Sequence, residues 1–142
     1  MGALFQDWRM SVAVVVVSWG LWAFFGKMAV DRLGWPTTAI VGFCVGALLM
    51  ASWVVPQFRW PGLIQIWPAA LYGVFGSLGA LMLMRALSQG PVALVLPLSE
   101  GYLVISVILA VLFLGEMMNL RRMAGLLLIL AGSVFLAGEG SP

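Results

Sequence analysis

The sequence predicts an all-α integral membrane protein with five transmembrane helices in a single domain, residues 1–142. Of the 142 residues, 63% are hydrophobic and 8% are charged, whereas soluble domains carry about 25% charged residues. The hydrophobic residues form segments long enough to cross a bilayer, since about 20 helical residues span roughly 30 Å. Tryptophan, proline and charged residues stand between these segments, as is typical of membrane interfaces.

The first three spans are expected at residues 10–30, 37–55 and 65–87. The first is too long for the hydrophobic region of a signal peptide, and no small-residue cleavage pattern follows it, so we expect it to be retained. The second and third spans are each preceded by tryptophan and proline. Because the connections are short, neighbouring helices are expected to be antiparallel.

The fourth and fifth spans are expected at residues 92–114 and 122–137. The fourth contains Glu100, which would lie about 13 Å from its start at 1.5 Å per residue. A charged side chain near the bilayer centre costs about 2.5–3.5 kcal/mol on insertion scales, so its presence suggests a function. Pro97 lacks a backbone N–H and Gly101 loosens the same turn, so we expect a kink here.

Two interpretations of Glu100 stay open. It is either a protonated carboxyl group bonded to a neighbouring helix, or a carboxylate that exchanges a proton for substrate. Ser99 and Tyr102 are polar neighbours and candidates for the same pathway. Non-helical backbone at this depth is tolerated where it is buried or lines a water-filled cavity.

Four further side chains are candidates for a substrate pathway. Trp19 and Trp22 lie near the middle of the first span, three residues apart on one helix face. They either pack between helices or form an aromatic wall that can contact a cationic ligand. Lys27 and Arg85 lie about one turn inside their spans. They either extend to the lipid head groups or line the mouth of a cavity. Asp31 is expected to be an ordinary interfacial charge.

Composition excludes several kinds of chemistry. The chain has no histidine and one cysteine, which excludes disulfide frameworks, zinc sites, histidine-dependent triads and Cys–His pairs. We expect no cofactor and no metal, and no enzyme, because no nucleophile, base and orienting group occur at comparable depth. The seven basic residues are too few and too scattered for a nucleic-acid-binding surface.

Glycines predict where helices approach closely. In lipid, small residues allow such approach without a hydrophobic driving force. Three sets recur at helical spacing on the second, third and fifth spans: Gly42 and Gly46; Gly73, Gly76 and Gly79; Gly125 and Gly132.

The run ALSQGPVALVLPLSEGYLVISVILAVLFLGE, followed by GLLLILAGSVFLA, resembles the EamA domain of the drug/metabolite transporter superfamily. The opening SWGLWAFFGKMA is similar to the first helix of that domain, so the resemblance covers residues 11 to 137. It implies an exporter of small organic metabolites or drugs in the inner or plasma membrane. Family members usually carry an apolar or small residue where this chain has Glu100, so the resemblance assigns Glu100 no role.

The resemblance also bears on assembly. Most family members carry two such domains in one chain, related by an inverted repeat. This chain has one, so we expect a homodimer in the bilayer, which an antiparallel arrangement would make inverted. The basic residues are nearly balanced between the two membrane sides, with Arg9, Arg59, Arg121 and Arg122 on one side and Lys27, Arg32 and Arg85 on the other. The alternative is a non-transporting membrane subunit or a lipid-carrier flippase component that requires a different partner.

Overall fold

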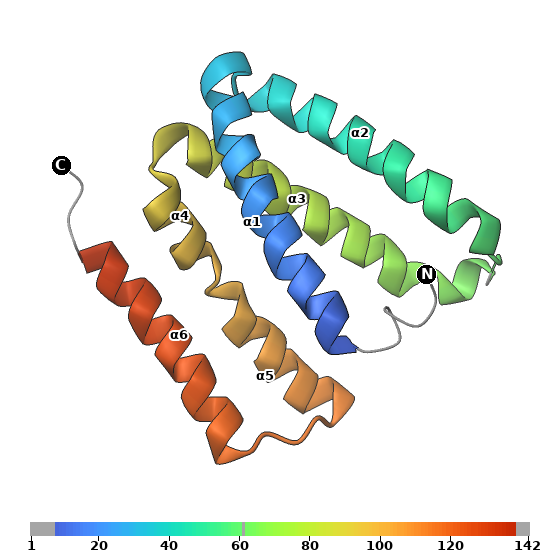
Figure 1. The fold of residues 1–142 in the computed structure, drawn as a ribbon. Coiled ribbons are helices and arrows are strands. Elements are labelled where there is room, and N and C mark those ends of the chain that lie inside the picture. Colours follow the sequence, from blue (N-terminus) through green and yellow to red (C-terminus); the bar gives the residue numbers. More distant parts are fainter. Residues whose placement is uncertain (1–7, 61, 139–142) are drawn as a thin grey trace. The chain divides into compact units, whose positions relative to one another are not determined.

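The computed structural model describes residues 8–60 and 62–138, and these residues form helices without any strand. The elements in chain order are α1 (Trp8–Leu33), α2 (Trp35–Val54), the short 3-10 turns η1 (Val55–Gln57) and η2 (Leu63–Gln65), α3 (Trp67–Gln89), α4 (Val92–Ser99), α5 (Tyr102–Leu114) and α6 (Leu120–Gly138) (Figure 1).

The expected all-α membrane class is confirmed. Among the described residues, four helical segments are long and apolar enough to cross a membrane: Trp8–Leu33, Trp35–Gln57, Trp67–Gln89 and Val92–Leu114. They lie within a few residues of the first four expected spans. The helix α6, of 19 residues, matches the position of the fifth but is not among these four. The count of five therefore stays a prediction.

The described chain divides into two compact units, which we describe separately. Unit 1 extends to Gln89 and contains α1, α2 and α3, whereas unit 2 begins at Gly90 and contains α4, α5 and α6. The single domain expected over residues 1–142 stays a prediction.

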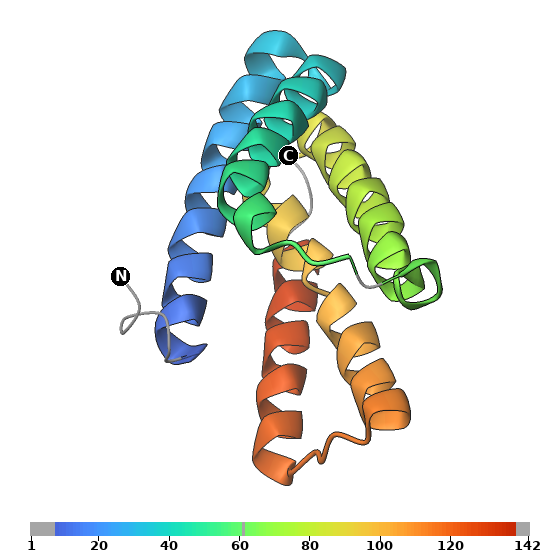
Figure 2. The same cartoon turned by 90° about the vertical axis from the view of Figure 1, so that its right-hand side faces the viewer.

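Unit 1 is packed at one end, which we call the closed end. Its buried residues come from the second half of α1, the first two turns of α2 and the end of α3; they are Ala23, Gly26, Val30, Thr38, Ala39, Met84 and Leu87. The three helices meet here, as Figures 1 and 2 show. In contrast, the described residues that precede Ala23 on α1 are exposed or half-buried.

A tight turn at Gly34 joins α1 to α2 at the closed end. Gly34 has φ 77°, a conformation that favours glycine, and its N–H bonds the carbonyl of Val30 at 2.9 Å. Its own carbonyl accepts the hydroxyl of Thr38 at 2.9 Å. Pro36 in the first turn of α2 suits a helix start, because its missing N–H would have no partner there. These bonds provide partners for backbone groups at the turn where a single residue, Gly34, reverses the direction of the chain.

In unit 2, α4 packs against α6. The partly buried face of α6 carries Leu126, Leu130 and Ser133, at spacings of four and three residues. The helix α5 ends at Gly115, whose φ of 67° is left-handed, and the N–H of Glu116 bonds the carbonyl of Ala110 at 3.3 Å. A polar cap then starts α6.

That cap is Asn119, whose side-chain oxygen accepts the N–H of Arg122 at 2.9 Å. The Arg122 guanidinium donates to the carbonyl of Met117 at 3.0 Å. The side chains of Asn119 and Arg122 therefore bond backbone groups on either side of the start of α6.

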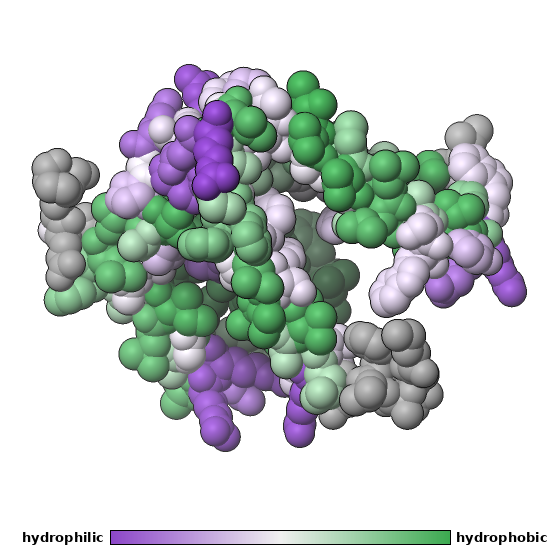
Figure 3. Space-filling model, turned by 45° about the horizontal axis from the view of Figure 1, so that its top comes forward, coloured by the Kyte–Doolittle hydropathy of each residue, from purple (hydrophilic) through white to green (hydrophobic). Residues whose placement is uncertain are grey.

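Most hydrophobic side chains of the described residues are exposed, as expected for surfaces that face lipid or a partner. Green, hydrophobic residues cover much of the face in Figure 3, and the purple, hydrophilic residues gather in a few clusters. The close packing expected at the glycines of the second, third and fifth spans is not seen in the described chain. A Cβ added at any of them would meet nothing within 4 Å. The close approach occurs instead at Gly26, where an added Cβ would lie 3.7 Å from the Met84 methyl group.

The two glycines of α1 give a matched test of this packing. We expect Gly26→Leu to destabilise the protein by about 1–3 kcal/mol, because its side chain overpacks the contact with Met84. Gly20→Leu on the same helix meets nothing within 4 Å in the described structure and is expected to be tolerated. Thermal unfolding of the detergent-solubilised variants measures the difference. Equal melting temperatures would show that α1 does not pack on α3 at Gly26.

Candidate functional site

The fourth membrane segment is interrupted at Glu100 and Gly101, between α4 and α5. Pro97 lies inside α4 and supplies no N–H to the carbonyl of Ala93. The bonds beyond it tighten from four-residue to three-residue spacing. The N–H of Glu100 still reaches Leu96 at 3.2 Å, whereas that of Gly101 bonds Leu98 at 3.2 Å.

The tighter bonding continues into the start of α5. The N–H of Leu103 bonds the carbonyl of Glu100 at 2.9 Å, and that of Val104 bonds Gly101 at 3.3 Å. These are 3-10 bonds, which occur within long helices at hinges and strained positions. A Cβ at Gly101 would lie 3.3 Å from the carbonyl oxygen of Leu98, so a larger residue would require that carbonyl to shift by a few tenths of an ångström.

Glu100 is half-buried at this interruption. Beside it, the Ser99 hydroxyl donates to the carbonyl of Leu96 at 2.7 Å, and Tyr102 is exposed. Among the described residues the only ion pair is between Lys27 and Asp31, so Glu100 has no cationic partner there. The described residues contain no group of acidic or cysteine side chains that could hold a metal ion. Glu100 therefore lies half-buried near the middle of the fourth membrane segment.

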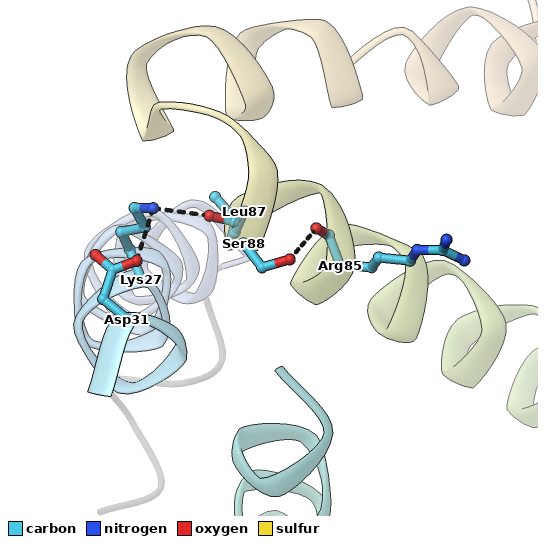
Figure 4. Close-up of polar contacts among 5 residues, drawn as sticks. All are labelled: Lys27, Asp31, Arg85, Leu87 and Ser88. Carbon is cyan, nitrogen blue, oxygen red and sulfur yellow. Dashed lines mark hydrogen bonds and ion pairs between the residues drawn. The ribbon is translucent and has the colours of Figure 1, made fainter. Parts of the chain in front are cut away.

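Lys27 lies at the closed end of unit 1. Its ammonium group donates to the carbonyl oxygen of Leu87 at 2.8 Å and pairs with the carboxylate of Asp31 at 2.8 Å (Figure 4). Asp31 is therefore more than an interfacial charge, because it holds the ammonium group that contacts α3. The sequence signal for this contact was Pro91, which removes the N–H that would bond Leu87 in a continuing helix.

Arg85 is exposed on α3, and its side chain points away from Lys27 (Figure 4). The hydroxyl of Ser88 bonds the backbone carbonyl of Arg85 at 2.6 Å. The structure does not bring Lys27 and Arg85 together.

Trp19 and Trp22 lie on α1 between the closed end and the N-terminus of the helix. They are 60% and 42% exposed, and neither stacks on another ring in the described part of the chain. They lie in unit 1, whereas Ser99, Glu100 and Tyr102 lie in unit 2.

Comparison with known proteins identifies the family. The model of the EamA-like transporter family matches residues 8–138, nearly the whole chain. The chain belongs to the EamA-like transporter family. Members of this family are transporters, and the apolar helices agree with a multi-pass membrane protein. No solved structure gives a significant match.

Two curated relatives resemble this EamA-like chain over most of their length. One, described as an uncharacterized transporter of Sinorhizobium sp., is 30% identical over 138 residues, which cover 93% of this chain and 97% of the relative. The other, an uncharacterized protein of Methanocaldococcus jannaschii, is 28% identical over 127 residues, which cover 87% of this chain and 91% of the relative. Both relatives are therefore about as long as this chain.

The interruption at Gly101 can be tested against a glycine in an open position. Replacing a helical glycine with alanine usually gains about 1 kcal/mol of helix propensity. We expect Gly125→Ala to keep or raise the melting temperature, because its Cβ meets nothing within 4 Å in the described structure. Gly101→Ala is expected to fall below Gly125→Ala, because its Cβ crowds the carbonyl of Leu98 at 3.3 Å. The reverse order in thermal unfolding would contradict the tight turn.

Proposed function

We propose that this EamA-like chain exports small organic molecules across the inner or plasma membrane, as a dimer of identical units that uses Glu100 to couple export to protons. Membership of a transporter family supports the transport function. The half-buried carboxyl group at the interruption of the fourth membrane segment supports the role of Glu100. The position of the Glu100 carboxyl group is the observation that carries the proposal, because the family pattern does not include a glutamate here.

The chemistry of the interruption suits proton exchange. An ionisable residue within a membrane segment is expensive to keep and usually lies on an ion or substrate pathway. Broken helices in transporters place free backbone groups and polar side chains at the binding site. Here Pro97 and Gly101 interrupt the helix, and Ser99 and Tyr102 lie within two residues of Glu100 in the sequence. A substrate that displaces the proton from Glu100 would exchange with it on each cycle.

The other pathway residues are proposed from their exposure and charge. Trp19 and Trp22 would offer aromatic faces to an organic solute. Arg85 would lie at the mouth of the pathway, where its exposed guanidinium group can meet an anionic group of the substrate or a lipid phosphate. Lys27 would lie at the same mouth and act through its contact with α3.

The proposed dimer rests on size and on exposed surface. The two curated relatives are also about one copy long, which suggests that a single copy is a recurring unit. A second copy in the opposite orientation would supply the inverted repeat found in many transporters. The exposed apolar helix faces of the described residues leave room for such a partner.

The role of Glu100 is tested by Glu100→Gln, with Glu116→Gln as the matched control. Glu116 is an exposed acid in the connection between α5 and α6. We expect Glu100→Gln to reduce proton-driven export by about tenfold or more, a change of about 1.4 kcal/mol. Glu116→Gln is expected to export like the parent. The measurement compares metabolites and dyes exported by cells that express each variant or an empty vector.

Each outcome of that comparison has a meaning. Equal export and equal pH dependence of the parent and Glu100→Gln would remove Glu100 from the coupling step while keeping an exporter. No export above the empty vector by the parent would contradict the exporter and favour a membrane subunit that needs another partner.

The inverted dimer predicts two orientations of one chain. We expect reporters fused to the C-terminus to give signals from both sides of the membrane, because the basic residues are nearly balanced. Adding two lysines near one end should drive most chains into one orientation and reduce export. Co-expression with the oppositely biased variant should restore it. Reporter signals from one side alone would contradict the antiparallel homodimer.

A further inference from the structure

The contact of Lys27 with Leu87 joins two helices that are far apart in the sequence. The donor and acceptor are separated by 60 positions, and the distance from Nζ to the carbonyl oxygen is 2.8 Å. Among the described residues, the other side-chain hydrogen bonds join positions five residues apart or fewer. Lys27 is therefore the polar link between α1 and α3 (Figure 4).

The Leu87 carbonyl needs an external donor for a reason visible in the sequence. The last four carbonyls of a helix lack intrahelical partners, and Leu87 is among them in α3. The residue four positions later is Pro91, which has no N–H to offer. Leu87 is fully buried, with 0% exposure, so water does not replace that donor in the packed state. The Lys27 ammonium group fills this position.

Asp31 orients the ammonium group. The order of Lys27 followed four residues later by an acid is the less favourable one for an isolated helix. An acidic residue near a helix C-terminus is also disfavoured by the helix dipole. The pair of Lys27 and Asp31 therefore adds little to the stability of α1 as an isolated helix. Its contact at 2.8 Å instead fixes Lys27, whose side chain is 28% exposed, in reach of Leu87.

We propose that Lys27, positioned by Asp31, is a latch that holds the closed end of unit 1 shut, and that release of this latch limits the rate of transport. The second part rests on the proposed transport function, whereas the first rests on the packing alone. A transporter has to open each end of its pathway in turn. Separating α1 from α3 at this end removes the donor from the Leu87 carbonyl, so it becomes favourable only when water enters to replace it.

The surrounding packing agrees with a latch at this position. The buried residues of unit 1 all lie within the closed end. Gly26, next to Lys27, lets α1 approach Met84, which lies about one helical turn before Leu87 on α3. The rest of α1 lies exposed or half-buried where described. Release of one polar contact and a few side-chain contacts would therefore free this end.

Cysteine labelling of the purified protein in nanodiscs tests the latch, because both membrane faces are then accessible. In a Cys44→Ala background, Ala39→Cys reports on the closed end, since Ala39 is 3% exposed in the first turns of α2. Thr37→Cys, two positions earlier and exposed, is the matched control for labelling itself. The probe is a water-soluble maleimide, which reacts with thiolates that water can reach.

We expect Lys27→Met to raise the labelling rate at Ala39→Cys by about tenfold or more, because hydrogen bonds to charged groups shift equilibria by at least that factor. Lys27→Arg is expected to label slowly, since arginine can still donate to Leu87. Asp31→Asn should lie between these two. The rate at Thr37→Cys should stay unchanged in all three. Slow labelling at Ala39→Cys in Lys27→Met would overturn the latch.

Pro91→Ala separates a latch from a simple helix cap. It restores an N–H that can bond the Leu87 carbonyl, so it should recover any loss of thermal stability in Lys27→Met. If Lys27 joins α1 to α3, labelling in Lys27→Met with Pro91→Ala stays fast. A return to slow labelling in that double variant would show that Lys27 only caps α3, and would overturn the proposal.

The labelling experiment is independent of transport. Fast labelling in Lys27→Met without export by the parent would leave the latch standing and remove the proposed function. Export by the parent with slow labelling in Lys27→Met would keep the function and remove the latch. Export that is unchanged in Lys27→Met despite fast labelling would show that release of the latch does not limit transport, and would overturn the second part of the proposal.

Discussion

Every backbone N–H and carbonyl within hydrocarbon needs a partner from the protein, because lipid offers none. This constraint accounts for the helices and also for the places where the chain departs from them. At Gly34 the departure lies at a turn and is satisfied locally by Thr38. Around Glu100, beyond the N–H that Pro97 lacks, the backbone bonds continue with three-residue spacing. At Leu87, next to a proline, the partner is a charged side chain from another helix.

The sequence predicted well which segments cross the membrane and predicted poorly which helix faces contact each other. Runs of apolar residues placed the first four spans within a few residues of the helices, since hydropathy reports transfer into lipid directly. Which helix face packs is a different question. Lipid and protein interiors are equally apolar, so the glycines of α2 and α3 carried no reliable signal. The contact at Gly26 depends on the position of Met84, which only the fold supplies.

In the candidate site, too, the sequence predicted some features and only the fold supplied others. Glu100, Pro97 and Gly101 stand out in the sequence because a charge, a missing N–H and a missing side chain occur within one turn. The partners of Lys27 did not stand out. Asp31 resembles an interfacial charge, and every residue has a backbone carbonyl, so the sequence does not mark the carbonyl of Leu87 as a partner. Pro91 was the available clue, four residues after Leu87. Family membership supplies the transport function, whereas Glu100 has to be argued from its own surroundings.

The long separation of Lys27 from Leu87 has a consequence for the synthesis of the protein. When α1 enters the bilayer, its ammonium group has Asp31 as a neighbour, but the carbonyl it will bond is 60 residues further along and reaches the membrane later. The pair can wait near the head groups during this time, because a lysine side chain reaches the interface from one turn inside. When α3 enters the bilayer, its Leu87 carbonyl has no backbone partner. The bond from Lys27, which joins the first and third helices, can form from then on.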